Sequence, residues 1–260
     1  MSLQYKISII TPSFNQAEYI ERTIKSILEQ SINFSLEYII VDGGSTDGTF
    51  EILERYKDKM KYVSEKDKGQ SDALNKGIAM SSGEIIGWLN SDDVYSPGIL
   101  QNVVNQFDTN PEKQWLFGKC QMIDEDDQIA RSWITSYKNH SCKNYRYTNL
   151  LTENFISQPS TFFRKSAFLK TGPIVIDQHW AMDYDLWLRL ANLSEPIFVD
   201  EYLSSFRLHG ESKSLNNFKL LFAEQYQIHK VFDQRWYYLF VHKVKINIIL
   251  LIYRLMAILK

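Results

Sequence analysis

The chain has 260 residues, of which 44% are hydrophobic and 23% are charged, and its formal net charge is −2. This composition excludes a disordered protein, and it gives no support for a nucleic-acid-binding chain, which would usually be strongly basic. The two cysteines, Cys120 and Cys142, lack the spacing of a zinc ribbon or a disulfide scaffold. The length suits one large α/β domain or two small ones.

Strand-like and helix-like segments alternate over the first hundred residues. Four β-rich or apolar runs predict strands at residues 6–11, 37–41, 61–64 and 84–89. Between them, Asn15 with Glu18 predicts a capping box, Asp47 predicts the N-cap of a second helix, and residues 71–81 predict a third. Near-continuous apolar strands that alternate with helices predict a mostly parallel sheet covered on both faces.

The second half of the chain has a weaker pattern. Residues 94–170 show little periodicity, apart from residues 158–163, which we expect to be an extended segment returning to the sheet. The sequence MDYDLWLRL predicts a helix from Met182, with leucines spaced for an apolar stripe. Residues 197–200 predict a further strand.

Each of the four predicted strands of the first half ends in polar or acidic residues. These are Thr11-Pro12-Ser13, Asp42, Glu65 with Asp67, and Asn90-Ser91-Asp92-Asp93. The carboxyl ends of parallel strands line the ligand crevice of an open sheet, so we expect several carboxylates in one cleft. Two like charges about 4 Å apart repel by roughly 4 kcal/mol at an effective dielectric constant of about 20, so the cluster needs a bound cation or separated, hydrogen-bonded acids. Oxygen ligands beside a phosphate suit Mg²⁺ or Mn²⁺.

Five motifs follow one another in the region 11–190: TPSFNQ, VDGGSTDGT, SEKDKGQSDALNKGI, GWLNSDD and DYDLWLRL. In this order and spacing they make the chain resemble a family 2 glycosyltransferase, an inverting enzyme that uses nucleotide-diphosphate sugars. The resemblance implies the GT-A fold, a Rossmann-like α/β fold with a mixed, mostly parallel sheet flanked by helices, here with a C-terminal helical tail. It implies a nucleotide-sugar-binding half in residues 1–93, an acceptor-binding and catalytic-base half of the same domain in residues 94–215, and the tail in residues 216–260.

The resemblance implies that the nucleotide is bound by Thr11, Pro12, Ser13, Asp42, Asp67, Asp72 and Asp92. Asp42 would accept a hydrogen bond from a base N–H, which favours uracil; the alternative is a turn residue ahead of Gly43. Asp72 would contact the nucleotide, or it would cap the helix that starts at Ser71. Asp47 is interpreted mainly as a helix cap.

Ser91-Asp92-Asp93 stands at the position of the family's DxD-type motif. By this resemblance, Asp92 would contact the ribose or the sugar, and Asp93 would bind Mn²⁺ or Mg²⁺. The cation would bridge the diphosphate and offset the charge on the leaving nucleotide. Ser91 in the first position leaves fewer carboxylates for the metal, and a surface turn is the alternative.

Two carboxylates compete for the role of general base in the helix from Met182. Asp183 lies in the first turn, where a carboxylate is stabilised and can point into a cleft. Asp185 has Arg189 four positions later and can form a helix-surface ion pair instead. The family's usual Glu-Asp pair falls on Met182-Asp183, so its Glu is absent. We expect Asp183 to be the base, with Asp185 as the alternative, because an inverting displacement needs one base and no carboxylate nucleophile.

The segment FRLHGESKS follows the last predicted strand. In the family a similar Arg-x-x-His or Arg-x-His element closes over the diphosphate, so the resemblance implies a diphosphate contact or a lid at Arg207 and His209. His209 would be a metal ligand or a phosphate hydrogen-bond donor, and a structural histidine is the alternative. The neighbouring Ser212, Lys213 and Ser214 are suited to a phosphate.

The net charge divides unevenly along the chain. Residues 229–260 carry six Lys and Arg and one Asp, a net charge of +5, which leaves −7 on residues 1–228. The tail combines aromatic and basic residues with apolar ones, but its apolar stretch is too short and interrupted to span a bilayer, which takes about 20 residues. It is predicted to be an amphipathic helix that lies on a membrane surface, forms a homodimer contact or packs on the body.

The N-terminus has no signal-peptide pattern, and the cysteine usage is compatible with a reducing compartment. We therefore expect a cytoplasmic protein, at most peripheral on the inner face of a membrane.

Three functions remain in competition. The leading interpretation is a metal-dependent inverting hexosyl- or N-acetylhexosaminyltransferase with a nucleotide-diphosphate donor, UDP first, and a glycan or lipid-linked saccharide acceptor. A polyprenyl-phosphate glycosyltransferase is an alternative within the same class of enzyme. A sugar-nucleotide-forming nucleotidyltransferase would want a Gly-rich, basic loop where this chain has TPSFNQ. A non-catalytic sugar-nucleotide-binding module is disfavoured by the simultaneous presence of Asp42, Asp92, Asp93 and Asp183.

Overall fold

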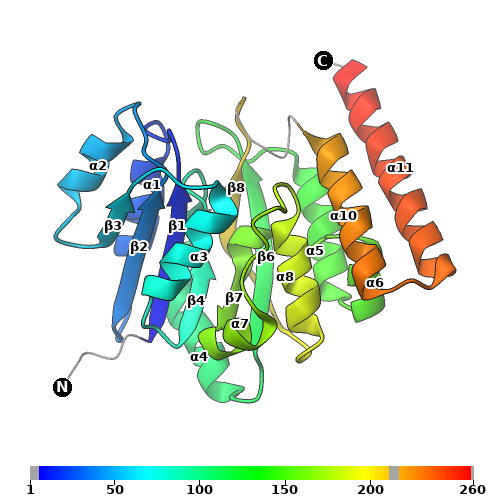
Figure 1. Cartoon of the computed structure of the whole chain (residues 1–260), viewed down its shortest axis with the longest axis horizontal. Helices are drawn as coiled ribbons and strands as arrows, with labels where there is room; N and C mark the ends of the chain where they lie inside the picture. Colours follow the sequence, from blue (N-terminus) through cyan, green and yellow to red (C-terminus); the bar gives the residue numbers. More distant parts are fainter. Residues whose placement is uncertain (1–5, 211–216, 259–260) are drawn as a thin grey trace.

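The computed structural model describes residues 6–210 and 217–258, with side chains up to Ile252. One sheet of eight strands, in the order β3-β2-β1-β4-β7-β6-β8-β5, forms the middle layer, and helices lie on both of its faces (Figure 1). The expected α/β class with a mixed, mostly parallel sheet is confirmed.

The first half of the sheet is parallel, as the sequence predicts. It consists of β1 (Ile7–Ser13), β2 (Leu36–Asp42), β3 (Lys61–Ser64) and β4 (Ile85–Trp88). The connecting helices are α1 (Ile20–Leu28), α2 (Thr49–Arg55) and α3 (Gln70–Met80). β1 and β4 are buried along their whole length, which is why neither shows an alternation of polar and apolar residues.

The second half makes the sheet mixed. Its strands are β5 (Val94–Tyr95), β6 (Trp115–Ile123), β7 (Thr161–Arg164) and β8 (Ile197–Arg207). β7 is antiparallel to both β4 and β6, β6 is parallel to β8, and β5 is antiparallel to β8. The expected return to the sheet is confirmed, because a 3₁₀ turn, η1 (Gln158–Ser160), leads directly into β7.

Residues 94–170, which the sequence predicts to be less regular than the first half, contain more regular structure than their pattern indicates. Besides β6 and β7 they form α4 (Ile99–Thr109), α5 (Ser132–Lys143), α6 (Tyr147–Thr152) and α7 (Lys165–Thr171). α5 buries only Thr135 and Cys142, and α6 is six residues long, so neither gives a clear periodic signal. Such helices depend on tertiary packing, here of α5 on β6. α8 (Met182–Ala191) starts at the predicted residue.

The predicted capping box at Asn15 was wrong. α1 begins at Ile20, and Asn15 lies in the loop before it with a φ of 51°. The Asn15 Oδ1 accepts the Thr46 N–H at 3.0 Å, and the Asn15 N–H donates to the Ser45 hydroxyl at 2.7 Å. Asn15 therefore joins the loop after β1 to the loop after β2, which keeps the carboxyl ends of these strands together.

A hydrophobic core lies on each face of the sheet. α1, α2 and α4 cover one face, with Phe107 in its core. α3, α7 and α8 cover the other, where the rings of Trp115 and Trp187 stack with centroids 6.1 Å apart. Cys120 and Cys142 are buried free thiols, in agreement with the absence of a disulfide scaffold.

Two helices after β8, α10 (Phe218–Phe232) and α11 (Trp236–Ile258), pack on the body, mainly on α6 and α8 (Figure 1). The Nδ1 atoms of His229 and His242, both fully buried, lie 2.7 Å apart between the two helices. Lys245 of α11 donates to the Thr152 hydroxyl of α6 at 3.1 Å. No helix in the described part of the chain is both long and apolar enough to cross a membrane.

Candidate functional site

A cleft of about 1110 Å³ opens along the carboxyl ends of the parallel strands. Its walls include Pro12 and Ser13 after β1, Gly43 and Gly44 after β2, Asp67 after β3, Asn90, Ser91 and Asp92 after β4, and Met182 and Asp183 of α8. Polar residues at or just after the ends of β1, β3 and β4 therefore meet in one crevice, as predicted. Of the acids expected there, Asp67 and Asp92 line the cleft, whereas Asp42, Glu65 and Asp93 do not.

The turn after β4 is fixed by an amide network that sequence reasoning missed. Asn90 Oδ1 accepts hydrogen bonds from Trp88 Nε1 and Gln70 Nε2, each at 2.8 Å. Asn90 Nδ2 donates to Gln158 Oε1 at 2.9 Å, and all four side chains line the cleft. The sequence shows only that Gln70, Asn90 and Gln158 are polar residues at or near the ends of their elements. Which of them form hydrogen bonds with one another depends on the fold.

The residues expected at the nucleotide divide into two groups. Those that line the cleft are Pro12, Ser13, Asp67 and Asp92, and those that do not are Thr11, Asp42 and Asp72. Thr11 is fully buried inside β1, where its hydroxyl accepts a hydrogen bond from the Tyr38 hydroxyl at 3.3 Å. Its expected contact with the nucleotide is therefore not supported.

Asp42 holds the turn that follows β2. Its Oδ2 accepts the backbone N–H of Gly44 at 3.1 Å and of Ser45 at 2.9 Å, and the Ser64 hydroxyl at 2.7 Å. Its Oδ1 accepts the Ser45 hydroxyl. Asp42 is fully buried, and both oxygens are used within the turn, so the geometry fits the turn alternative and not the expected bond to a base.

Asp67 occupies the position beside Gly43 instead. A Cβ atom on Gly43 would lie 3.0 Å from Asp67 Oδ2, so a larger residue there would crowd the carboxylate. The Asp67 Oδ1 accepts the Gly69 N–H at 2.7 Å, whereas Oδ2 has no hydrogen bond within the described structure. Asp67 therefore presents a carboxylate oxygen to a ligand in the cleft.

Asp47 and Asp72 serve the starts of helices. Asp47 Oδ1 accepts the Thr49 N–H at 3.0 Å and Oδ2 accepts the Ala17 N–H at 2.9 Å. Burial alone would raise the pKa of Asp47, but these hydrogen bonds outweigh burial and lower it. Asp72 Oδ2 accepts the Lys68 N–H at 3.1 Å, and this bond is the largest cause that lowers the pKa of Asp72. The helix-cap alternative fits both residues.

The DxD-type turn presents one aspartate to the cleft and buries the other. Asp92 lines the cleft, whereas Asp93 is fully buried and its Oδ1 accepts the Arg207 N–H at 2.9 Å. Asp93 Oδ2 has no hydrogen-bond partner in the described structure. Burial, followed by the charge of Asp92, raises the pKa of Asp93 well above the usual range. The expected metal role of Asp93 therefore does not fit its position, because its carboxylate faces the interior.

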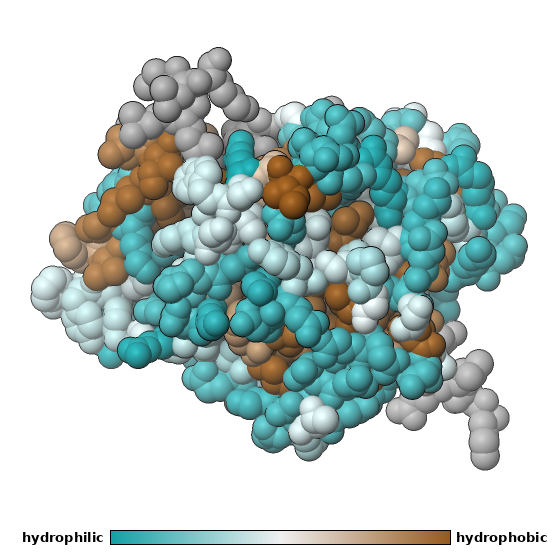
Figure 2. All heavy atoms as spheres, turned by 180° about the vertical axis from the view of Figure 1, so that it is seen from behind, coloured by the Kyte–Doolittle hydropathy of each residue, from teal (hydrophilic) through white to brown (hydrophobic). Residues whose placement is uncertain are grey.

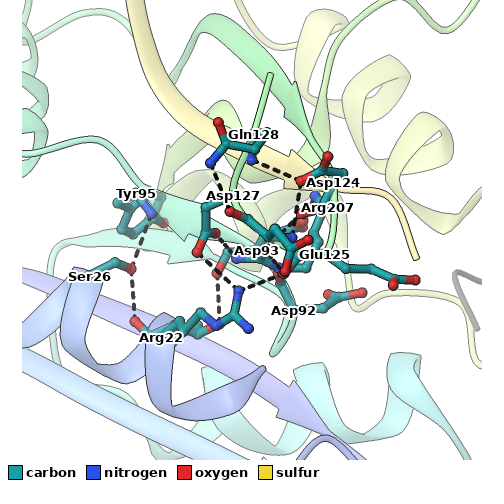
Figure 3. Close-up of polar contacts among 12 residues, drawn as sticks. Arg22, Ser26, Asp92, Asp93, Tyr95, Asp124, Glu125, Asp127, Gln128 and Arg207 are labelled. Atoms are coloured by element: carbon teal, nitrogen blue, oxygen red, sulfur yellow. Dashed lines mark hydrogen bonds and ion pairs between the residues drawn. The ribbon is translucent and has the colours of Figure 1, made fainter. Parts of the chain in front are cut away.

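Arg207 clamps two turns and does not line the cleft (Figure 3). Its Nε donates to the Asp92 carbonyl oxygen at 2.8 Å and its Nη1 to the Asp124 carbonyl oxygen at 2.9 Å. Its Nη2 lies 2.6 Å from Asp127 Oδ1, and Arg22 of α1 reaches Oδ2 of the same aspartate at 3.0 Å. The expected closure of Arg207 over the diphosphate is not supported, since this fully buried side chain fixes the backbone of Asp92. The acidic run that contains Asp124 and Asp127 was the missed signal.

His209 is buried and does not itself line the cleft, but it lies directly beside Asp92, which does. Its Nε2 is 3.0 Å from Asp92 Oδ2, and its ring packs on the Tyr19 ring with centroids 4.6 Å apart. A carboxylate oxygen and an imidazole nitrogen form a donor set that suits Mn²⁺. Among the described residues no group of three or more His, Cys, Asp and Glu side chains is arranged to hold a metal, so a cation here would need further ligands from a bound diphosphate or water. Ser212, Lys213 and Ser214 lie outside the described residues.

Asp183 stands at the start of α8 and lines the cleft. Its Oδ2 accepts a hydrogen bond from Asn154 Nδ2 at 3.1 Å, and its Oδ1 accepts the Tyr184 N–H at 2.8 Å. Burial raises the pKa of Asp183, and these hydrogen bonds and the charge of Lys138 offset the rise only in part. A carboxylate with a raised pKa is a stronger base, which is what proton abstraction requires.

Asp185 faces a different part of the molecule. Its Oδ2 lies 2.7 Å from Arg189 Nη2, and Arg189 Nη1 donates to the carbonyl oxygens of Thr171 and Gly172 at 3.0 and 2.8 Å. Asp185 and Arg189 border a separate hollow of about 470 Å³. Asp185 therefore joins α8 to the end of α7, and the structure does not support it as a base in the main cleft.

Three cations that sequence reasoning left without a role also line the cleft: Lys66, Arg131 and Lys138. None of them forms an ion pair within the described part of the chain. Unpaired cations in the same cleft as Asp92 and Asp183 give the cleft the charge complementarity that a phosphate-bearing ligand requires.

Comparison with known proteins places most of the chain in one family. The model of glycosyl transferase family 2 matches residues 8–172. The chain is 30% identical over 220 residues to an uncharacterized glycosyltransferase of Nostoc sp., covering 81% of this chain and 67% of that protein. It is 27% identical over 212 residues to chondroitin synthase of Escherichia coli, covering 80% of this chain and 30% of that protein. Other relatives are also longer: the chain spans 36% of an uncharacterized glycosyltransferase of Rickettsia felis, at 29% identity over 81% of this chain.

Solved structures share the fold. S. aureus TarS in complex with UDP matches with a TM-score of 0.62 at 18% identity, covering 87% of this chain and 70% of that chain. The mannosyltransferase PcManGT from Pyrobaculum calidifontis, in complex with GDP-Man and Mn²⁺, matches with a TM-score of 0.67 at 18% identity, covering 87% of this chain and 65% of that chain.

Proposed function

The chain belongs to glycosyltransferase family 2 and has the GT-A fold, and from this premise we propose that it is a divalent-metal-dependent, inverting transferase. It moves a sugar from a UDP-linked donor to a hydroxyl group of a glycan or a lipid-linked saccharide. The observation that carries the proposal is that Asp92 and Asp183, from opposite halves of the chain, line one cleft. Residues 1–93 would hold the donor, and residues 94–215 would supply the acceptor site and the base.

Asp67 is the residue that recognises the base in this proposal. Uracil offers one ring N–H donor at its pairing edge, and Asp67 Oδ2 is an acceptor without a partner in the described structure. Gly43 keeps the neighbouring space open. The complexes of TarS with UDP and UDP-GlcNAc support a uridine nucleotide, whereas the GDP-Man complex of PcManGT makes guanosine the comparison to test.

Asp92 and His209 take the metal role that the sequence suggested for Asp93. The Asp92 Oδ2 and the His209 Nε2 lie 3.0 Å apart, and a carboxylate oxygen with an imidazole nitrogen suits Mn²⁺. Mn²⁺ or Mg²⁺ at this site would supply a Lewis acid that offsets charge on the leaving diphosphate. The Mn²⁺ complex of PcManGT supports a divalent cation in this fold. Arg207 serves the pair by holding the Asp92 backbone.

Asp183 is the general base of the proposed reaction. The acceptor oxygen attacks the anomeric carbon while the bond from that carbon to the phosphate oxygen breaks, and the acceptor proton passes to the Asp183 carboxylate. Asn154 Nδ2 fixes Oδ2 of that carboxylate, and burial raises its pKa toward the range in which it competes for a hydroxyl proton. Attack from the face opposite the nucleotide inverts the anomeric configuration.

A thermal-shift screen of UDP, GDP and their sugars, each with and without Mn²⁺, tests the donor and the metal together. A ligand at about 100 times its Kd stabilises a protein by about 2.7 kcal/mol, so the correct donor should raise the melting temperature only when Mn²⁺ is present. Stabilisation by no nucleotide diphosphate under any condition would overturn the proposal.

The stereochemistry of the product tests the mechanism separately. NMR of the glycoside formed from an α-linked donor should show the β anomer. Retention of the α configuration would contradict the single-base mechanism, and formation of a new nucleotide sugar from a sugar phosphate would favour a nucleotidyltransferase.

A further inference from the structure

The cleft continues beyond Asp183 into an apolar extension between α5 and the pair α10–α11. We call this extension the apolar arm and define it by its apolar lining, Trp133, Ile134, Phe222, Ile246, Ile249 and Ile252. Gln225, His242 and Lys245 of α10 and α11 also line the cavity. The arm belongs to the same continuous cavity of about 1110 Å³ as Asp92 and Asp183. The proposed donor and base account for the polar part of this cavity and leave the arm without an occupant.

The lining of the apolar arm selects the chemistry of its occupant. Isoleucine side chains neither donate nor accept hydrogen bonds, so sugar hydroxyl groups placed there would lose their bonds to water without replacement. A hydrocarbon chain gains from the same burial. The arm therefore suits the lipid part of an acceptor and not its saccharide part.

Lys138 adds a positive charge to the cavity that contains both the apolar arm and Asp183. Lys138 lies one turn after Ile134 on α5, so the two side chains share a face of the helix. Lys138 and Asp183 line the same cavity, and Lys138 has no ion pair in the described structure. The charge of Lys138 lowers the pKa of Asp183. Another cation that lines the cavity, Lys245, is matched by Glu153 Oε2 at 3.2 Å. Lys138 thus complements a phosphate between a hydrocarbon chain and a sugar.

α11 is apolar on two sides. Its inner side lines the arm, and its outer side carries an apolar stripe at helical spacing, 39–61% exposed, made of Tyr237, Phe240, Val244, Ile248 and Leu251. Figure 2 shows apolar side chains gathered on this side of the molecule. Ile248 lines the cavity and is also 53% exposed, so it stands at the border between the arm and the outer stripe. An apolar stripe of this kind indicates a surface that faces lipid or a partner.

We infer that the apolar arm binds the hydrocarbon chain of a phosphate-linked lipid acceptor, with Lys138 at its phosphate and Asp183 at the hydroxyl that receives the sugar. The inference rests on the proposed function, because that function makes Asp183 the acceptor-side residue. The border position of Ile248 provides a path from a lipid surface along α11 into the arm.

Isothermal titration of the whole chain with octyl, decyl and dodecyl phosphate, below their micelle concentrations, tests the arm. Affinity should rise about fourfold for each buried methylene, and inorganic phosphate should not bind measurably. Ile249→Ser should weaken dodecyl phosphate binding by about tenfold or more. Ile249→Phe, which fills the arm but keeps the helix apolar, should do the same. Lys138→Gln should weaken decyl phosphate but not decanol.

Val244→Ser is the matched control, because Val244 lies on the outer stripe and does not line the cavity. It should leave alkyl phosphate binding unchanged. Affinity independent of chain length would overturn the inference, and so would an equal loss in Val244→Ser and Ile249→Ser, which would assign the binding to the outer face. A titration with UDP and Mn²⁺, without alkyl phosphate, separates the two proposals. If UDP does not bind, the proposed donor is wrong, whereas alkyl phosphate binding can still be measured independently.

Discussion

The Nε2 of His209 lies 3.0 Å from the Oδ2 of Asp92, although 117 positions separate the two residues in the sequence. Asp92 follows β4 and His209 follows β8, and Arg207 at the end of β8 donates a hydrogen bond to the Asp92 carbonyl oxygen. Of the two neighbouring aspartates in the DxD-type turn, only Asp92 lines the cleft.

Asp92→Asn should abolish Mn²⁺-dependent UDP binding, because an amide oxygen is a weaker ligand for a divalent cation than a carboxylate. The change is isosteric and Asp92 is partly exposed, so the melting temperature without ligands should stay close to the original value. Titration calorimetry of UDP with and without Mn²⁺ measures the effect.

Asp93→Asn provides the comparison for that experiment. The amide oxygen can still accept the Arg207 N–H in the interior, so Mn²⁺-dependent UDP binding should persist. Asp93→Ala leaves that N–H without its acceptor and should cost about 1–3 kcal/mol of stability. Loss of metal-dependent binding in Asp93→Asn, with normal stability, would return the metal role to Asp93.

Asp183→Asn should reduce kcat by roughly 10²–10⁴-fold while UDP binding persists, because the amide cannot accept the acceptor proton. Asp185→Asn is the matched control on the same helix. It weakens the ion pair with Arg189, so it should lower the melting temperature and leave kcat nearly unchanged. Transfer assays and UDP titrations of both variants decide the matter, and near-normal transfer by Asp183→Asn would refute the assignment.

The pH profile of kcat/KM should carry the signature of Asp183. Burial raises the pKa of this group, and the base works only as the carboxylate. The value of kcat/KM should therefore rise with pH along an acidic limb whose apparent pKa lies above the ordinary range of aspartate. Asn154→Ala removes an amide donor that favours the carboxylate, so the pKa should rise further and the limb should move to higher pH. A limb that stays in place in Asn154→Ala would separate the titration from Asp183.

Asp67→Asn should weaken UDP binding by tens of fold, since a hydrogen bond to a charged group contributes about 1.5–3 kcal/mol. Asp42→Asn offers a contrast, because Asp42 acts inside the turn and its loss should appear as reduced stability. Competition binding with UDP and CDP measures base preference, which Asp67→Asn should relax. An unchanged preference would remove Asp67 from base recognition.

The buried pair His229 and His242 should make α10–α11 sensitive to acid. Burial, followed by the charge of His242, lowers the pKa of His229 to about 4, while Asp233 opposes the shift. Because the folded pKa lies below the unfolded value of about 6.5, the folded state favours the neutral ring. Its stabilising contribution is complete above about pH 6.5 and is lost as the pH falls toward 4.

Melting temperatures between pH 7.5 and 4.5 test this expectation. His229→Gln should lose less stability than the original chain over that interval, because its side chain does not titrate. Equal losses in both proteins would exclude His229 as the acid-sensitive group.

Much of the fold could be predicted from local patterns in the sequence. The apolar runs of β1, β2, β3 and β4 and the start of α8 at Met182 were predicted because a strand buried on both faces and an amphipathic helix leave a direct trace in neighbouring residues. α5 was missed, because a helix with two buried residues acquires its stability from the strand on which it packs, here β6.

The sequence by itself determined the family, the parallel first half of the sheet and the gathering of carboxylates at its edge, because these follow from motif order and from patterns within a few residues. Only the tertiary structure decided which aspartate of the DxD-type turn faces the cleft, and that Asp67 and not Asp42 lines it. Asp93 turns inward to the Arg207 N–H, Asp185 turns away to Arg189, and Asp42 is consumed by its own turn while Asp67 stays available. Asp92 and Asp93 are adjacent and chemically identical, and the Arg207 N–H that holds Asp93 comes from a segment 114 positions away, so no local pattern could rank these two residues. The ion pair of Asp185, in contrast, was predictable, because Arg189 lies only four positions later on the same helix.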